Sequence, residues 1–136
     1  HYFSENQSEE PYSQSREFNK GIEALKQYDR PGSLDAAEKS FNRILQHTPN
    51  NAAAVAGLSL VYSYRYNSDS EDLIWMQKAD ASAQQALQLN PQLAIAHIAM
   101  ARASSIQSRH DKALTEFEKA LTLEPNNSFA LRGQVS

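Results

Sequence analysis

The chain has 136 residues, of which 40% are hydrophobic, and this length and composition suit one globular domain. It carries 13 Lys and Arg against 16 Asp and Glu, and this net charge of −3 argues against nucleic-acid binding, which needs clustered positive charge. The absence of cysteine excludes disulfide scaffolds, thiol catalysis and cysteine-type zinc sites.

The predicted elements are helices, because apolar residues recur at steps of three and four along most of the chain. In chain order, we expect helices over 14–28, 34–47, 52–66, 69–89, 94–107 and 110–123, and a short helix from 128. Breaks such as residues 30–33 carry Pro and Gly. Ser68 with Glu71, and Ser108 with Asp111, have the capping-box spacing that marks a helix start.

These helices fall into a repeat of about 34 residues. Pro49, Pro91 and Pro125 are separated by 42 and 34 residues, and the same two offsets relate several sets of apolar positions. The longer offset places eight extra residues between Tyr62 and Ala79. We therefore expect a flexible extension over 1–14 and a repeat domain over 15–136, with repeats at about 15–49, 50–91 and 92–125 and a partial repeat over 126–136.

The third repeat resembles the tetratricopeptide repeat (TPR) family. Its small residues Ala101, Ala113 and Ala120, the aromatic Phe117 and the proline Pro125 stand at the positions where that family has them. The resemblance extends over nearly the whole chain. It implies an all-α, right-handed superhelical solenoid of antiparallel helix hairpins, and a non-catalytic module that binds a protein or peptide.

In that family, the first helix of each repeat lines a concave groove. The candidate partner-binding residues at the corresponding positions are Ile22, Lys26, Ala56, Leu60, Ile95, Ile98, Arg102 and Ser105. Most are apolar, which favours an amphipathic helix or an extended hydrophobic segment as the partner. Because Ala53 and Ala56 stand where polar clamp residues would be expected, capture of a C-terminal carboxylate is disfavoured. We expect Ile98→Glu to leave the fold intact and to abolish groove binding.

An alternative is that the groove is filled by the chain itself. Tyr2-Phe3 and Pro11-Tyr12 are the apolar segments near the N-terminus that could occupy it. A neighbouring copy of the chain could fill the groove as well. The sequence leaves these alternatives and an external peptide open.

The eight-residue insertion gathers Tyr, Trp and Arg side chains, which are typical of interface hot spots. Tyr64, Tyr66 and Trp75 are therefore candidate protruding contacts. The alternative interpretation is that the lengthened hairpin buries its own tip, with Tyr62, Tyr66, Leu73 and Trp75 packed together.

No residue pattern indicates catalysis, a metal ion or a cofactor. His47 and His110 fall at predicted helix ends, and His97 occupies a packing position. The acidic residues over 69–72 lack the glycine of a calcium-binding loop. No apolar run approaches the ~18 residues of a membrane span, so we expect a soluble segment without membrane contact.

Two further function classes stay open. The segments over 21–25, 34–64 and 79–101 resemble TPR-type domains of CadC-like, membrane-anchored bacterial regulators, which implies a signal-sensing domain in the periplasm rather than the cytoplasm. The other class is self-assembly into a homo-oligomer. Because the chain begins with His1 and stops within a repeat, we expect a piece of a longer protein, whose last repeat would expose an apolar face.

Overall fold

The computed structural model describes residues 10–68 and 72–135, and these residues form seven helices and no strand. The helices are α2 (Gln14–Lys26), α3 (Ser33–His47), α4 (Ala52–Ser68), α5 (Leu73–Leu89), α6 (Ala94–Ile106), α7 (His110–Leu123) and α8 (Ser128–Val135). The all-α prediction is confirmed. Six predicted helix starts lie within one residue of the observed ones, whereas α5 begins at 73 rather than 69. Residues 1–9 of the predicted flexible extension lie outside the described residues.

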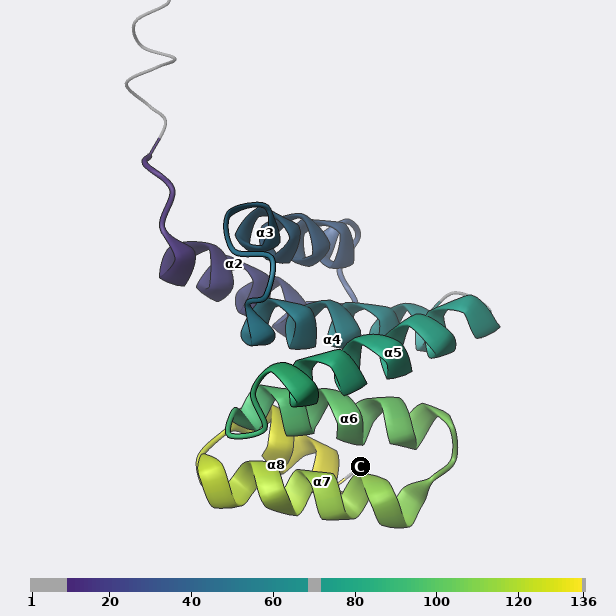
Figure 1. Ribbon diagram of the computed structural model, residues 1–136. Coiled ribbons are helices and arrows are strands. Elements are labelled where there is room, and N and C mark those ends of the chain that lie inside the picture. The colour runs from purple at the N-terminus through teal and green to yellow at the C-terminus, as the bar shows by residue number, and fades with distance from the viewer. Residues whose placement is uncertain (1–9, 69–71, 136) are drawn as a thin grey trace, which may run out of the picture.

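Consecutive helices pair into hairpins that stack in one direction (Figure 1). The hairpins α2–α3, α4–α5 and α6–α7 follow one another, and α8 lies against α6 and α7. Within the described residues, the first helices α2, α4, α6 and α8 touch in succession, while the second helices α3, α5 and α7 do not touch one another. The first helices therefore form the inner side of a curved stack, as in a helical repeat solenoid.

Aromatic rings on the second helices insert against glycine residues of the first helices. Phe41 of α3 is fully buried, and a Cβ atom added to Gly21 of α2 would lie 2.5 Å from its ring. A Cβ atom added to Gly57 of α4 would lie 2.6 Å from the same ring. Phe117 of α7 meets Gly133 of α8 in the same way. Because a side chain at these glycines would occupy the volume of a ring, glycine determines how closely the layers approach.

Gly57 follows Phe41 by sixteen residues, and Gly133 follows Phe117 by the same number. The same spacing recurs in the middle repeat. Ala83 and Ala99 stand sixteen residues apart at the equivalent positions, and both are fully buried. The middle repeat thus has the small Ala83 in place of the phenylalanine and the larger Ala99 in place of the glycine. Such an exchange keeps the packed volume more nearly constant, which is what a close-packed core tolerates best.

Both predicted capping boxes are wrong. Ser68 is the last residue of α4, where its hydroxyl donates to a backbone carbonyl one turn earlier, and Glu71 lies outside the described residues. Asp72 caps α5 instead, with its carboxylate accepting a backbone N–H at 3.1 Å. Ser108 has φ = 62° in the α6–α7 turn, and Arg109 is the N-cap residue of α7. Each serine therefore belongs to the end of a helix rather than to the start of the next.

The eight-residue insertion lengthens both helices of the middle hairpin. Helices α4 and α5 have 17 residues each, compared with 13 in α6 and 14 in α7. Three or four added residues correspond to about one turn, or ~5 Å, in each helix. In Figure 1, α4 and α5 reach beyond the neighbouring helices on one side. The insertion therefore forms a projecting hairpin tip.

A buried polar pair ties α6 to α7. His97 Nδ1 lies 2.7 Å from Glu116 Oε1, and His97 Nε2 lies 2.7 Å from the Pro91 carbonyl oxygen. Both side chains are buried. Because both ring nitrogens already face oxygen acceptors, the imidazole is fixed in place and serves packing. The prediction that His97 is a packing residue is confirmed.

Gly57→Ala is expected to destabilise the domain by about 1–3 kcal/mol, because the new methyl group overlaps the Phe41 ring. Helix propensity alone predicts the opposite, since alanine is favoured over glycine by about 1 kcal/mol. Urea unfolding followed by circular dichroism measures the difference. In a Phe41→Leu background the substitution should become nearly neutral, and an equal cost in both backgrounds would show that the ring is not the cause.

Candidate functional site

The inner surface of the first helices is hollowed into a pocket of about 340 Å³, called the inner pocket below. Its walls come from all four first helices, with Ile22 and Lys26 on α2, Ala53 on α4, Ile95 on α6 and Phe129 on α8. The turns before α6 and α8 complete it. The stacking of hairpins thus brings apolar side chains from the whole length of the chain to one concave surface.

The structure divides the predicted groove residues into accessible and buried ones. Those that line the inner pocket are Ile22, Lys26, Ile95 and Ile98. However, Ile98 has no exposed surface, and neither do Ala56 and Leu60. These three side chains belong to the core and offer no contact area to a partner, which corrects their predicted role. Within the inner pocket, the predicted residues that are accessible are Ile22, Lys26 and Ile95.

Phe129 is a pocket residue that the sequence reasoning missed. It follows Ile95 by 34 residues, and Ile95 follows Ala53 by 42, so the repeat spacing alone places all three at equivalent positions. Asn127 fixes the start of α8, because its Oδ1 accepts two backbone N–H groups of this helix at 3.0 and 3.2 Å. The short last helix is therefore a full part of the concave surface.

Charges lie at the rim of the inner pocket. Lys26 Nζ is 3.1 Å from the carboxylate of Glu23, and both side chains are exposed. Glu124 lines the pocket from the turn before α8. Exposed pairs of this kind contribute little to stability, and rim charges orient a partner more than they hold it.

The sequence pattern of the tetratricopeptide repeat family matches residues 94–127, which hold α6, α7 and their turns. Residues 94–127 are therefore a tetratricopeptide repeat. The first TPR domain of human RPAP3 is similar in structure, with a TM-score of 0.61 and 22% identity over 88% of this chain and 84% of that chain. No curated protein sequence matches the chain.

Two further solved structures share the fold. A mutant O-GlcNAc transferase from Thermobaculum terrenum superposes with a TM-score of 0.62 and 21% identity over 91% of this chain, which spans only 22% of that enzyme. The second TPR domain of human RPAP3, in complex with the HSP70 peptide SGPTIEEVD, has a TM-score of 0.55 and 18% identity over 90% of this chain and 96% of that chain. The predicted helical solenoid is confirmed, and TPR domains are in general non-catalytic scaffolds. The CadC-like resemblance stays a prediction.

The remaining two predicted groove residues of the TPR domain, Arg102 and Ser105, line a separate pocket of about 490 Å³ near the α6–α7 turn. The guanidinium carbon of Arg102 lies 5.6 Å from the centre of the Tyr64 ring and 5.8 Å from that of Phe117. Burial raises the pKa of the Tyr64 hydroxyl, although the charge of Arg102 opposes this rise. Two aromatic rings therefore hold the arginine in position.

At the α4–α5 tip, the structure supports the self-burial interpretation in part. Tyr64 is buried and stacks on Tyr28 with the ring centres 4.5 Å apart, so its prediction as a protruding contact is wrong. Tyr62 stacks on Trp75 with the ring centres 6.0 Å apart, as self-burial predicts. In contrast, Leu73 is 61% exposed, so the prediction that it joins this cluster is wrong.

Arg65 anchors the tip to the preceding hairpin. Its Nη2 donates to Asp35 Oδ1 at 2.6 Å and to Glu38 Oε1 at 2.9 Å, and its guanidinium carbon lies 5.5 Å from the centre of the Trp75 ring. Although partial burial opposes the charge, the hydrogen bonds to both carboxylates raise the pKa of Arg65. Tyr66 and Trp75 are half-buried, and their role as contact residues stays a prediction.

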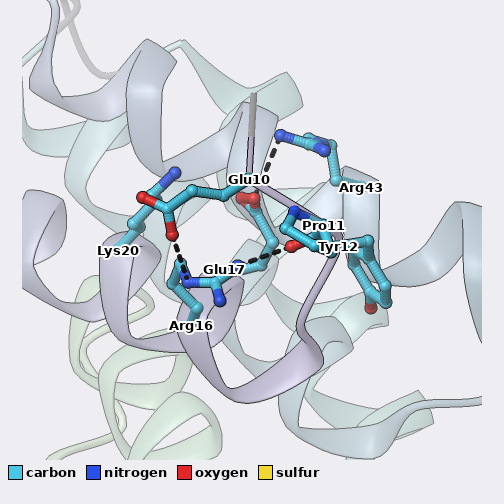
Figure 2. Close-up of a pocket in the computed structure, with 7 residues that line it drawn as sticks. All are labelled: Glu10, Pro11, Tyr12, Arg16, Glu17, Lys20 and Arg43. Carbon is cyan, nitrogen blue, oxygen red and sulfur yellow. Dashed lines mark hydrogen bonds and ion pairs between the residues drawn. The ribbon is translucent and has the colours of Figure 1, made fainter. Parts of the chain in front are cut away.

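The segment before α2 packs beside α2 and α3 and does not line the inner pocket (Figure 2). Tyr12 stacks on His47 with the ring centres 3.6 Å apart. Two Arg–Glu ion pairs, each 3.1 Å long, lie in the pocket of about 370 Å³ that this segment lines. The prediction that Pro11-Tyr12 fills the groove is therefore wrong, and Tyr2-Phe3 lies outside the described residues.

In the described ranges, no group of three or more His, Cys, Asp and Glu side chains is placed to hold a metal ion. None of the helices described is both long and apolar enough to cross a membrane. His47 is the last residue of α3 and His110 the first of α7, which agrees with their predicted places at helix ends. The acidic residues over 69–71 lie outside the described residues.

The burial of Ile98 reverses our expectation for its glutamate variant. Ile98→Glu is expected to destabilise the domain by about 3 kcal/mol or more, because a carboxylate would be buried without a partner. Ile95→Glu, on the half-buried wall of the inner pocket, is expected to cost about 1 kcal/mol or less. Urea unfolding of both variants tests this contrast, and wild-type stability of Ile98→Glu would contradict it.

Proposed function

We propose that this TPR domain is a protein–protein interaction module that holds an apolar peptide segment in the inner pocket. The observation that carries the proposal is the concave pocket itself, whose apolar wall is built by four helices and is not occupied by the described residues before α2. The second RPAP3 TPR domain, in complex with an HSP70 peptide, supports protein or peptide partners for this fold in general.

The incomplete burial of the apolar pocket residues supplies the driving force for peptide binding. Ile22, Ala53 and Ile95 are only half-buried in the free domain, so a partner that covers them removes further apolar surface from water. Each hydrophobic partner side chain that is buried in return contributes about 1.5–3 kcal/mol before the cost of association. Two or three such side chains suffice for a specific, reversible contact.

The inner pocket is poorly suited to an acidic C-terminus. Capture of a terminal carboxylate needs cationic and amide side chains that converge on it. On α4, Ala53 and Ala56 stand at the inner positions, and Ala56 is fully buried. On α2, Lys26 is at the rim and is paired with Glu23. The floor of the pocket therefore selects apolar side chains.

The proposal is tested with a random peptide library displayed on phage, followed by fluorescence anisotropy with one enriched synthetic peptide. Ile95→Glu is expected to weaken binding about tenfold or more, because it places a charge on the pocket wall. Leu73→Glu, which adds the same charge at the exposed tip, is the matched control and should leave the affinity unchanged. If Leu73→Glu weakened binding and Ile95→Glu did not, the binding surface would lie at the α4–α5 tip instead.

Self-assembly is a second candidate function, which the outer surface of the last two helices favours. Helix α8 covers α7 with Phe129 and Ala130 buried, but Leu114 of α7 and Leu131 of α8 are 48% and 46% exposed. Light scattering over a concentration series tests it. A dimer that Leu131→Glu dissociates would support self-assembly, whereas a monomer at high micromolar concentration would contradict it.

The sensor function implied by the CadC-like resemblance stays a prediction. It requires a parent protein in which a winged-helix domain and a transmembrane stretch precede this domain. The gene sequence around this domain therefore tests the alternative, and a cytosolic repeat array in place of these elements would remove it.

A further inference from the structure

We infer that His97 holds a proton on each ring nitrogen in the folded domain, and that loss of one of these protons releases the turn that carries Leu93, a residue of the inner pocket wall. The His97 site consists of His97 on α6, Glu116 on α7 and the carbonyl group of Pro91 in the turn before α6. The protonation is independent of the proposed function, whereas its effect on peptide binding rests on that function.

Both neighbours of the His97 ring accept hydrogen bonds. Nδ1 lies 2.7 Å from Glu116 Oε1, and Nε2 lies 2.7 Å from the carbonyl oxygen of Pro91. A neutral imidazole has one N–H group, so it donates to one of two such oxygens. The other oxygen would then face the lone pair of an unprotonated nitrogen. Short contacts to acceptors on both sides therefore favour the doubly protonated, positively charged ring.

The surroundings of Glu116 favour an ionised carboxylate at this site. Its side chain is 9% exposed, and its second oxygen, Oε2, lies 3.3 Å from Lys119 Nζ. A buried carboxylate needs positive partners, and the ring of His97 and the ammonium group of Lys119 face one oxygen each. Because the Lys119 side chain is 55% exposed, its charge stays largely in water. The protonated ring of His97 therefore supplies the buried positive charge.

Charges on the neighbouring helices are engaged elsewhere. Helices α4, α5, α7 and α8 pack on α6, and apart from α7 the charged residues on α6 and on these helices are Arg65, Lys78, Asp80, Arg102 and Arg132. Arg65 binds carboxylates of α3, Asp80 accepts from a glutamine, and the other three lie over aromatic rings. The other titratable side chains of α7 are exposed. Among the described residues, the ion-pair contacts at the His97 site thus come from Glu116 and Lys119.

Loss of a proton affects the two hydrogen bonds of the ring unequally. A carboxylate is a stronger acceptor than a backbone carbonyl, so the neutral ring keeps its N–H on Nδ1, toward Glu116. Nε2 then faces the Pro91 carbonyl without a hydrogen, and the bond between α6 and the preceding turn is lost. Leu93 in this turn is the N-cap residue of α6 and lines the inner pocket. The proton on Nε2 therefore holds one wall of the pocket in place.

The sign of the pH dependence follows from the number of bound protons. A histidine exposed to water, as in the unfolded chain, loses its proton at about pH 6.5. Below this pH both states hold the proton, and the stabilisation is fully present. Above it the folded domain keeps the proton between its two acceptors and thus binds one proton more than the unfolded chain. The free energy of unfolding therefore decreases as the pH rises.

Urea unfolding followed by circular dichroism, at about pH 6 and about pH 8.5, tests this linkage. For wild type, we expect the equilibrium constant for unfolding to increase about tenfold or more between the two values. The increase should remain in His110→Gln, which removes an exposed histidine from the same repeat, and fall to about twofold or less in His97→Gln. An increase that persists in His97→Gln, or none in wild type, would overturn the inference.

NMR of the wild-type domain keeps the test independent of whether His97→Gln folds. At about pH 7.5, where an exposed histidine is mostly neutral, the nitrogen chemical shifts of the His97 ring should show N–H groups on both nitrogens. At higher pH, Nε2 should lose its proton before Nδ1, and the methyl signals of Leu93 should shift with the same midpoint. An unprotonated His97 nitrogen at about pH 7.5, or earlier loss from Nδ1, would contradict the inference.

Peptide binding separates this inference from the proposed function. With a histidine-free peptide enriched on wild type, we expect the affinity to weaken about fivefold or more from about pH 6 to about pH 8.5, and to stay constant for His97→Gln. If no peptide binds, the proposed function fails, whereas the urea and NMR results still decide the state of His97. A constant wild-type affinity, although Nε2 loses its proton, would overturn the coupling to the inner pocket.

Discussion

The contact between a phenylalanine ring and a glycine backbone controls the spacing of the helix layers. Phe41 fills the space that side chains at Gly21 and Gly57 would need, and Phe117 does the same at Gly133. Because the ring sits between a second helix and the next first helix, it sets the distance between consecutive hairpins. The depth and width of the inner pocket follow from that distance, since its walls are the first helices themselves.

Close packing of the first helices explains why so little of the concave surface is accessible. Alanine and glycine dominate the contact positions, so the backbones approach closely and cover the larger side chains between them. Leu60 and Ile98 point into this contact and are fully buried. Ala53 and Ile95 near the starts of α4 and α6, and Ile22 in the second half of α2, stay half-buried and line the open part. The same packing thus stabilises the fold and limits the accessible part of the concave surface.

The sequence was sufficient to predict the helices and their order, because apolar spacing and the breaks at proline recur with the period of the repeat. It could not predict exposure at single positions. The position of Leu60 or Ile98 within the repeat indicates that the side chain points toward the concave side. Whether it is buried there depends on how closely the neighbouring first helix packs against it. The capping error at Ser68 has a similar origin, because the insertion prolongs α4 through this residue instead of ending before it. Phe129 could have been found, since it repeats the position of Ile95.

Helix α6 contributes side chains to two pockets with different surroundings. Its first turn contributes Ile95 to an apolar pocket, where burial supplies affinity with little discrimination between hydrophobic partners. Two turns later, Arg102 lies close to the rings of Tyr64 and Phe117, which restrict its long side chain. The distance between these two surroundings is therefore set by the rigid helix and not by a flexible loop.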